Sequence, residues 1–230
     1  FFEKKSLTYA NLIIFVADRV REEMKPIIGT NFNKTVVIPA AFNNEKFKNS
    51  VLPVSDVFNK ILTIGRISHQ KNFELALRAF EKSKKQNVNL TLTIAGDGEL
   101  KQQLIKIINQ SVYKKDIDFL GLVPHDEVPK LIQSHGIVLV SSRYEASPTI
   151  VKESIASLRP VVTTDVGDVN LWVVEGKNGF ISKHNSNDLS DKILKANSLL
   201  FENKYEQAVD LNIFSENHIM NQLYDKYLSL

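Results

Sequence analysis

The stretch KILTIGRISHQKNFELALRAFEKSKKQNVNLTLTIAG, which spans residues 60–96, has the pattern of a strand, a helix and a second strand. Its two ends are the short apolar runs Lys60–Ile64 and Leu90–Ala95, and apolar residues recur at helical spacing over Phe73–Lys84 between them. A helix that joins two buried strands is typical of a β-α-β unit, in which the two strands are parallel. This stretch therefore favours an α/β fold.

The same alternation of short apolar runs and helical segments extends over most of the chain. Several of the runs are apolar throughout, as in strands that helices cover on both faces. We therefore predict an α/β fold with a Rossmann-like parallel sheet and helices on both faces of the sheet. The other predicted strands are Leu12–Val16, Thr35–Ile38, Ile117–Leu120, Ile137–Ser141 and Val161–Thr164. The other predicted helices are Glu99–Ile108, Asp126–Ser134, Thr149–Ser157, Asn187–Leu200 and Ser215–Tyr227.

A change of composition divides the chain near residue 50. The stretch Pro39–Val54 is rich in asparagine and has little periodicity, which is typical of a linker. We predict three parts: residues 1–52 are the end of a preceding domain with its linker, residues 53–210 are a complete Rossmann-like domain, and residues 211–230 are a final helical segment. Because the chain begins with Phe1 rather than Met, we expect it to be a piece of a longer protein.

The composition excludes several classes of protein. The 230 residues contain no cysteine, which excludes a disulfide scaffold, a cysteine-ligated metal site and a cysteine nucleophile. The net charge is only +3 and the lysines are spread along the chain, so we expect no nucleic-acid partner. The longest apolar run, Leu12–Ala17, is far shorter than the ~20 residues that span a bilayer. The histidines are scattered and no acidic pair suits a metal, so we expect no metal cofactor.

The first candidate site is the loop that follows the strand Lys60–Ile64. Gly65 lets the backbone approach a ligand closely, Arg66 stands at the strand end, and Lys71 precedes the helix. Loops at the carboxyl ends of parallel strands are where α/β sheets bind ligands. Two cations beside a helix N-terminus suit a diphosphate, although both could equally be ordinary surface cations.

Two more loops follow neighbouring strands. Ala95–Glu99 contains two glycines, and we interpret it mainly as a structural turn in which Asp97 caps the next helix. Gly121 ends the following strand, and the backbone of Leu122 and Val123 beyond it is suited to read the edge of a nucleotide base.

The third candidate site runs from Ser141 into the next helix. Ser147 is a good N-cap and Pro148 a favoured first helical residue. The free amides of Thr149 and Ile150 would then point toward the same edge of the sheet as the two cations.

Two glutamates in this segment stand eight positions apart. Glu145 lies in the loop, and Glu153 lies about one turn into the helix. A carboxylate accepts two hydrogen bonds from vicinal hydroxyls, which is the usual grip on a ribose, and Glu153 is placed for it. Two glutamates also occur at this spacing by chance in a charged chain, so the pair alone decides little.

Together these segments resemble the nucleotide-sugar-binding half of the family-four (group 1) glycosyltransferases, whose GT-B fold consists of two Rossmann-like domains. The resemblance covers nearly all of the chain, and the order of the motifs is more specific than any one of them. The matching motifs are Gly65-Arg66 with Lys71, Ala95-Gly96-Asp97-Gly98, Phe119-Leu120-Gly121, Glu145 with Glu153, Val161-Val162 with Gly167, and Asn178-Gly179-Phe180.

The resemblance implies a role for each site residue. Arg66 and Lys71 would hold the diphosphate and stabilise its charge as it leaves, without a metal. Glu153 would bind the ribose, and Glu145 would contact hydroxyls of the donor sugar; Arg66, Lys71 and Glu145 would be the catalytic residues. The other contacts would come from Gly65, from the amides of Ala146, Ser147, Thr149 and Ile150, and from Leu122 and Val123 near the base.

The resemblance also implies an activity and a setting. The full protein would be a retaining, metal-independent enzyme that transfers a sugar from a donor such as a UDP- or GDP-sugar to a polysaccharide, lipopolysaccharide or glycolipid. The acceptor would bind the preceding domain, to which the last helix would cross back, so this chain would be mainly the donor-binding part and poorly active alone. Exposed apolar patches on Phe1–Ile38 and on the last helix would be the sign of that interface. We expect a bacterial, cytoplasmic protein, at the inner face of the membrane if its acceptor is lipid-linked.

Some residues depart from the usual pattern of this family. Glu-Ala-Ser-Pro-Thr begins at Glu145 where Glu-Gly-Phe-Gly-Leu is commoner, which leaves the donor sugar open. Asp168 stands where a second glycine is usual, and Leu171 where a glutamate is frequent. Two other functions stay open: a non-catalytic nucleotide-sugar-binding subunit that needs a partner chain, and an epimerase of the same fold.

Overall fold

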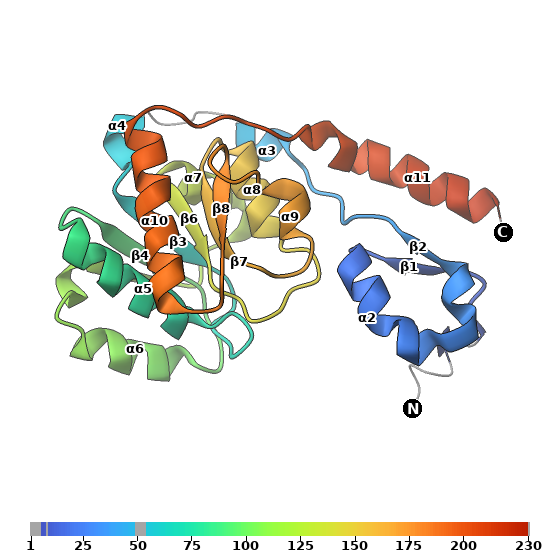
Figure 1. Ribbon diagram of the computed structural model, residues 1–230, viewed down its shortest axis with the longest axis horizontal. Helices are drawn as coiled ribbons and strands as arrows, with labels where there is room; N and C mark the ends of the chain where they lie inside the picture. The colour runs from blue at the N-terminus through green and yellow to red at the C-terminus, as the bar shows by residue number, and fades with distance from the viewer. Residues whose placement is uncertain (1–5, 8, 49–53, 230) are drawn as a thin grey trace.

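The computed structural model describes residues 6–7, 9–48 and 54–229, and it consists of a larger unit built on six strands and a smaller unit built on two (Figure 1). All six strands of the larger sheet are parallel, in the order β5-β4-β3-β6-β7-β8. Their bounds are β3 Lys60–Ile64, β4 Thr91–Ala95, β5 Ile117–Gly121, β6 Ile137–Val140, β7 Val161–Thr164 and β8 Gly179–Ser182. The chain runs outward from β3 to β5 and returns to β6 on the other side of β3, and such a reversal creates the ligand-binding edge of a Rossmann-like sheet.

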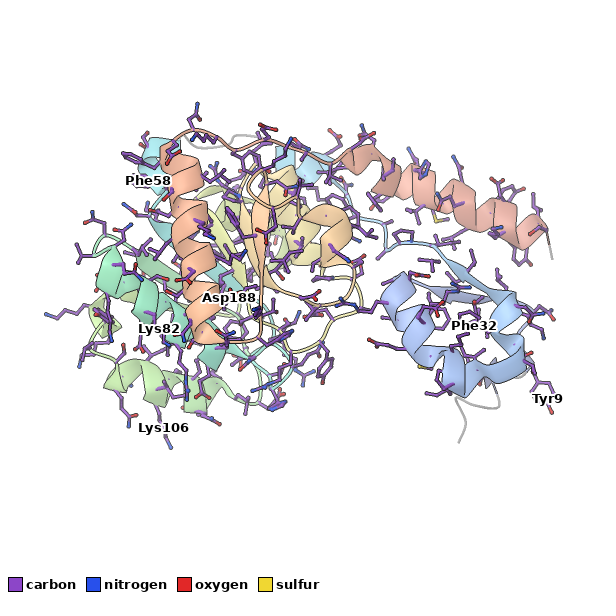
Figure 2. The ribbon with its side chains drawn as sticks, in the orientation of Figure 1. Tyr9, Phe32, Phe58, Lys82, Lys106 and Asp188 are labelled. Atoms are coloured by element: carbon purple, nitrogen blue, oxygen red, sulfur yellow. The ribbon has the colours of Figure 1, made fainter. Side chains whose placement is uncertain are left out.

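One face of this sheet is covered by α5 (Phe73–Gln86), α6 (Lys101–Gln110) and α10 (Ser186–Phe201). Their apolar side chains pack on the sheet in one buried cluster, as the helical spacing predicts. The helices α5 and α10 lie side by side, with Lys82 of α5 close to the start of α10 near Asp188 (Figure 2).

The opposite face is covered by α7 (Val128–Gln133), α8 (Thr149–Ala156) and α9 (Val169–Trp172). A second buried cluster joins these helices to the sheet, and it includes Phe42 and Phe214 from the segments that lead out of the larger unit. Helices therefore lie on both faces of a parallel sheet, which confirms the predicted fold class.

The predicted strands of the larger unit are confirmed, but the prediction omits β8. Asn178 and Gly179 have the composition of a turn, which hides the strand that begins there. Gly179 is needed for a different reason: a Cβ atom at this position would lie 2.3 Å from the Val161 carbonyl oxygen of β7. The glycine thus permits close strand packing rather than a turn.

The smaller unit consists of β1 (Ile13–Phe15), α2 (Asp18–Ile28), a 3₁₀ turn and β2 (Thr35–Val37), with β1 and β2 parallel. Inside it, the Arg21 guanidinium lies 4.3 Å from the centre of the Phe32 ring. The two strands correspond to the predicted strands Leu12–Val16 and Thr35–Ile38, and α2 between them completes a β-α-β unit.

Two segments lead out of the larger unit toward the smaller one. The first is Ile38–Phe47, which ends in the short helix α3 (Glu45–Lys48), before α4 (Val54–Val57) opens the larger unit. The second leads through a 3₁₀ turn at Leu211–Phe214 into α11 (Glu216–Leu228), which extends toward the side on which the smaller unit lies (Figure 1). The predicted boundary between residues 52 and 53 lies outside the described residues.

Exposed large apolar side chains occur in both predicted regions within the described ranges. On α11 the exposed apolar residues are four, three and one positions apart in sequence, so their side chains share one face of the helix. The exposed side chains are Tyr9, Ile14, Val16 and Ile27 in the N-terminal region, and Met220, Tyr224, Tyr227 and Leu228 on α11. Among the described helices, none has the combination of length and apolar composition that crossing a membrane would require.

Candidate functional site

The loop after β3 is held by direct backbone packing against the loop after β4. A Cβ atom on Gly96 would lie 1.9 Å from the Gly65 carbonyl oxygen, and one on Gly98 would lie 2.4 Å from that of Ile67. The Ile67 amide donates to the Asp97 carbonyl at 2.8 Å. The Ala95–Glu99 turn is therefore structural, as expected, and only glycine fits its two close contacts.

Asp97 does not cap the next helix, and this part of the prediction is wrong. The helix α6 begins at Lys101, two residues later than predicted, with Leu100 at its N-cap position. The Asp97 carboxylate instead accepts from the Gly98 amide at 2.7 Å and from Lys101 Nζ at 2.6 Å. These two bonds lower the pKa of Asp97.

Arg66 projects into solvent from the loop after β3. Its side chain is 75% exposed, and its Nε lies 3.2 Å from Oε2 of Glu99. An ion pair this exposed is weak, so an anionic ligand can replace Glu99 at the guanidinium.

Lys71 forms a closer ion pair with Glu145. Its Nζ lies 2.6 Å from Oε1 of Glu145, and the two side chains are 26% and 11% exposed. The same oxygen accepts from the Ser142 hydroxyl at 2.8 Å, and the other carboxylate oxygen lies 3.4 Å from Gln70 Nε2. The alkyl chain of Lys71 passes within 3.7 Å of the place where a Cβ on Gly65 would be. The residues predicted to hold diphosphate and sugar are thus in direct contact.

The loop from Glu145 to Ser147 rests on the loop after β7. A Cβ on Gly167 would lie 2.3 Å from the Ala146 carbonyl oxygen, so the two backbones touch. The Ser147 hydroxyl donates to Oδ2 of Asp168 at 2.7 Å. The sequence predicts Ser147 as the N-cap of α8, and this prediction is wrong, because the Ser147 hydroxyl donates to Asp168 instead.

The helix α8 begins one residue later than its proline. Pro148 occupies the N-cap position, so the expectation that it is the first helical residue is wrong. The Val151 amide donates to the Pro148 carbonyl at 3.1 Å, and the amides of Thr149 and Ile150 precede this first bond of the helix. Such first-turn amides attract anions.

Glu153 differs from the other acidic residues of this region. Within the part of the chain that the structure describes, its carboxylate makes no hydrogen bond or ion pair, although it is half-buried. Burial raises the pKa of Glu153, and the charge of His125 opposes this effect to a smaller extent. A buried carboxylate without a partner destabilises a fold, and such groups concentrate at functional sites.

The residues predicted to lie near the base follow β5. Leu122 is 78% exposed, whereas Val123 packs on the cluster beneath α7 and α8. In the described ranges, no group of three histidine or acidic side chains is arranged to hold a metal ion.

The structure brings together the loops after β3, β6 and β7, and it pairs Lys71 with Glu145. Sequence analysis missed the supporting residues Ser142 and Gln70, and it gave no role to Lys152. A lysine amid the apolar residues of a buried helix was the available signal for Lys152, which is fully buried.

Known proteins of similar structure share this fold. A glycosyltransferase from Rickettsia africae matches with a TM-score of 0.82 and 19% identity, over 97% of this chain and 65% of that one. HepE from Anabaena, solved with UDP-glucose, matches with a TM-score of 0.80 and 21% identity, over 99% and 68%.

Sequence comparison identifies the family. An uncharacterized glycosyltransferase from Methanocaldococcus jannaschii is 29% identical over 178 residues, which are 73% of this chain and 45% of the relative. The chain spans about half the length of the curated relatives it matches first, at 45% and 52%. The family model for glycosyl transferases group 1 matches residues 44–209. The chain therefore belongs to the group 1 glycosyltransferases.

Proposed function

We propose that the chain binds a nucleotide-diphospho-sugar and is the donor-binding part of a glycosyltransferase. The observation that carries this proposal is Glu153, a half-buried carboxylate on the second turn of α8 that has no partner among the described residues; Thr149 and Ile150 are the first two residues of the same helix. Such a carboxylate suits the vicinal hydroxyls of a ribose, because both of its oxygens are free to accept.

The diphosphate would lie between the two loops that carry the cations. Arg66 has only a weak, exposed partner to exchange for a phosphate oxygen. Lys71 would contact the phosphate nearest the sugar, which weakens its bond to Glu145. The amides of Thr149 and Ile150 would bind the same group at the helix N-terminus.

Glu145 would then be free to accept from hydroxyls of the donor sugar, together with the amides of Ala146 and Ser147. Leu122 and Val123 would lie beside the base. Support for a UDP-sugar comes from HepE, which was solved with UDP-glucose. A GDP-sugar fits the same contacts, because all of them except those to the base are shared.

In the reaction, the bond between the anomeric carbon and the diphosphate oxygen breaks, and its electron pair leaves with the diphosphate. The anomeric carbon bonds to the hydroxyl oxygen of a polysaccharide, lipopolysaccharide or glycolipid acceptor, whose proton passes to the departing phosphate. Arg66 and Lys71 would stabilise the growing negative charge, so no metal is needed, and retention of configuration is the expected outcome.

Calorimetric titration of the chain with UDP, GDP and their sugars, with and without EDTA, tests this proposal. We expect one binding site per chain, and about tenfold weaker binding in Arg66→Ala. Arg78→Ala is the matched control, since Arg78 is also an exposed arginine paired with a glutamate. A folded chain that binds none of these ligands would contradict the proposal, and binding that EDTA abolishes would contradict its metal independence.

A further inference from the structure

Lys152 is a fully buried lysine on α8, next to Glu153 in the sequence. Its Nζ donates a hydrogen bond to the Ala40 carbonyl at 3.1 Å. It also lies 4.5 Å from the centre of the Trp172 ring and 5.7 Å from that of Phe214. Among the described residues, the ammonium group therefore has one hydrogen-bond acceptor and two aromatic rings around it.

These contacts join both segments that lead out of the larger unit. Ala40 belongs to the first segment and Phe214 to the second, and the Phe42 amide donates to the Phe214 carbonyl at 3.3 Å. A displacement of either segment would change the surroundings of the Lys152 ammonium.

Asp168 is the N-cap residue of α9, the helix that ends at Trp172, and its carboxylate contacts the loop of Glu145 through Ser147. It is 4% exposed; its Oδ2 accepts from the Ser147 hydroxyl, and its Oδ1 has no hydrogen-bond partner among the described residues. Burial lowers the pKa of Lys152, and the negative charge of Asp168 opposes that effect. The helix α9 joins the two residues, because Asp168 is its N-cap and its last residue, Trp172, packs on the Lys152 ammonium.

We propose that Lys152 and Asp168 are positioning residues that couple the two outgoing segments, at Ala40 and Phe214, to the sugar-facing loop Glu145–Ser147. The proposal rests on the proposed function, in which this loop contacts the donor sugar. A buried ammonium and a buried carboxylate that are each only partly satisfied resist separation, because an isolated buried charge is costly. Movement of the Ala40 carbonyl would shift the ammonium relative to Asp168, and with it the hold of Asp168 on Ser147.

A purely structural role does not require this lysine. An apolar side chain of similar length would fill the same space without desolvating a charge, and such replacements are often neutral or stabilising. A lysine is required here only if its positive charge contributes to function. The groups that interact with this charge are the Ala40 carbonyl, which accepts its hydrogen bond, and the negatively charged Asp168.

Hydrogen exchange tests the coupling directly. In Lys152→Met, which keeps most of the length of the side chain, we expect the Arg143 amide, which donates to the Gln70 carbonyl at the start of this loop, to exchange at least about tenfold faster. Lys84→Met is the matched control, because Lys84 is also buried and charged but pairs with Asp116 and the Leu90 carbonyl. It should leave the exchange of this loop unchanged relative to the rest of the domain.

Two further variants define the route. Asp168→Asn keeps an oxygen for Ser147 but removes the charge, so it should speed exchange at Ala40–Phe42, and its effect should not add to that of Lys152→Met. Lys152→Arg should restore slow exchange in part. Faster exchange confined to the linker in Lys152→Met, or a uniform increase across the domain, would overturn the coupling.

Ligand binding separates this inference from the proposed function. Lys152→Met should reduce the preference for a nucleotide sugar over the free nucleotide about tenfold while changing nucleotide affinity less than about threefold. If the wild-type chain bound no nucleotide sugar, the proposed function would fail, whereas the exchange experiment would still decide whether Lys152 couples the two regions.

Discussion

The two glutamates at positions 145 and 153 stand in opposite physical situations. Glu145 is held by Lys71 at 2.6 Å and by the Ser142 hydroxyl at 2.8 Å, so its charge is compensated without any ligand. Glu153 is half-buried with no partner, and its pKa is raised. Glu145 stabilises the fold and must exchange partners to bind a sugar. Glu153 has no partner among the described residues, which lowers the stability of the fold but leaves its carboxylate available to a ligand. The two glutamates of this motif thus differ in what their carboxylates do in the chain without a ligand.

Replacement of Glu153, the carboxylate without a partner, should have the largest effect on nucleotide binding. In Glu153→Gln we expect nucleotide affinity to fall about 10- to 100-fold, because hydrogen bonds to a charged group are lost. The midpoint of denaturant unfolding should stay the same or rise, because the variant no longer buries an unpaired charge. Calorimetry and urea titration of the same preparation check both, with the exposed Glu202→Gln as the control. A loss of stability in Glu153→Gln would contradict the proposed difference between the unpaired Glu153 and the paired Glu145.

Replacement of the paired carboxylate should have the reverse profile. Glu145→Gln should lose about 1–2 kcal/mol of unfolding free energy, because it breaks a largely buried ion pair. Its affinity for the free nucleoside diphosphate should hold or improve, since Lys71 is released, while the extra affinity contributed by the sugar is lost. Urea titration and calorimetry with a nucleotide and its sugar measure these changes, and equal losses for both ligands would remove the distinction between the two glutamates.

The contrast also predicts a pH dependence. Because burial raises the pKa of Glu153 above 4.5, nucleotide binding should weaken as pH falls through a range higher than that of an ordinary glutamate. Protonation of this group favours the folded state, so its unfavourable effect on stability should grow as pH rises through the raised pKa. Binding and stability measured from pH 4 to pH 8 should show both trends in the wild type, and Glu153→Gln should flatten both.

The smallest effect is expected when Glu99, the partner of Arg66, is replaced. Glu99 competes with the diphosphate for this guanidinium, so Glu99→Gln should tighten nucleotide binding up to about threefold, and less at high salt. Calorimetry at two ionic strengths measures this change. Weaker binding in the variant would mean that Glu99 orients Arg66 rather than competing for it.

The alternation of apolar runs was enough to predict the parallel sheet and its two helical layers, because burial on both faces leaves a strong pattern. It missed β8, since Gly179 resembles a turn residue when only its neighbours in sequence are known. It placed the start of α8 correctly at Thr149 but chose the wrong cap, because local preference favours Ser147 and only the fold shows that Asp168 accepts from its hydroxyl. Lys152 could not be placed for the same reason: its partner Ala40 lies 112 positions away.

The most direct test of the account compares a nucleotide with its 2′,3′-dideoxy analogue by calorimetry, on the wild-type chain and on Glu153→Gln. If the Glu153 carboxylate binds the ribose, the wild type should bind the intact nucleotide at least about tenfold more tightly than the analogue, and the variant should lose most of this difference in affinity. An equal preference in both proteins would show that Glu153 does not bind the ribose and would contradict the central claim.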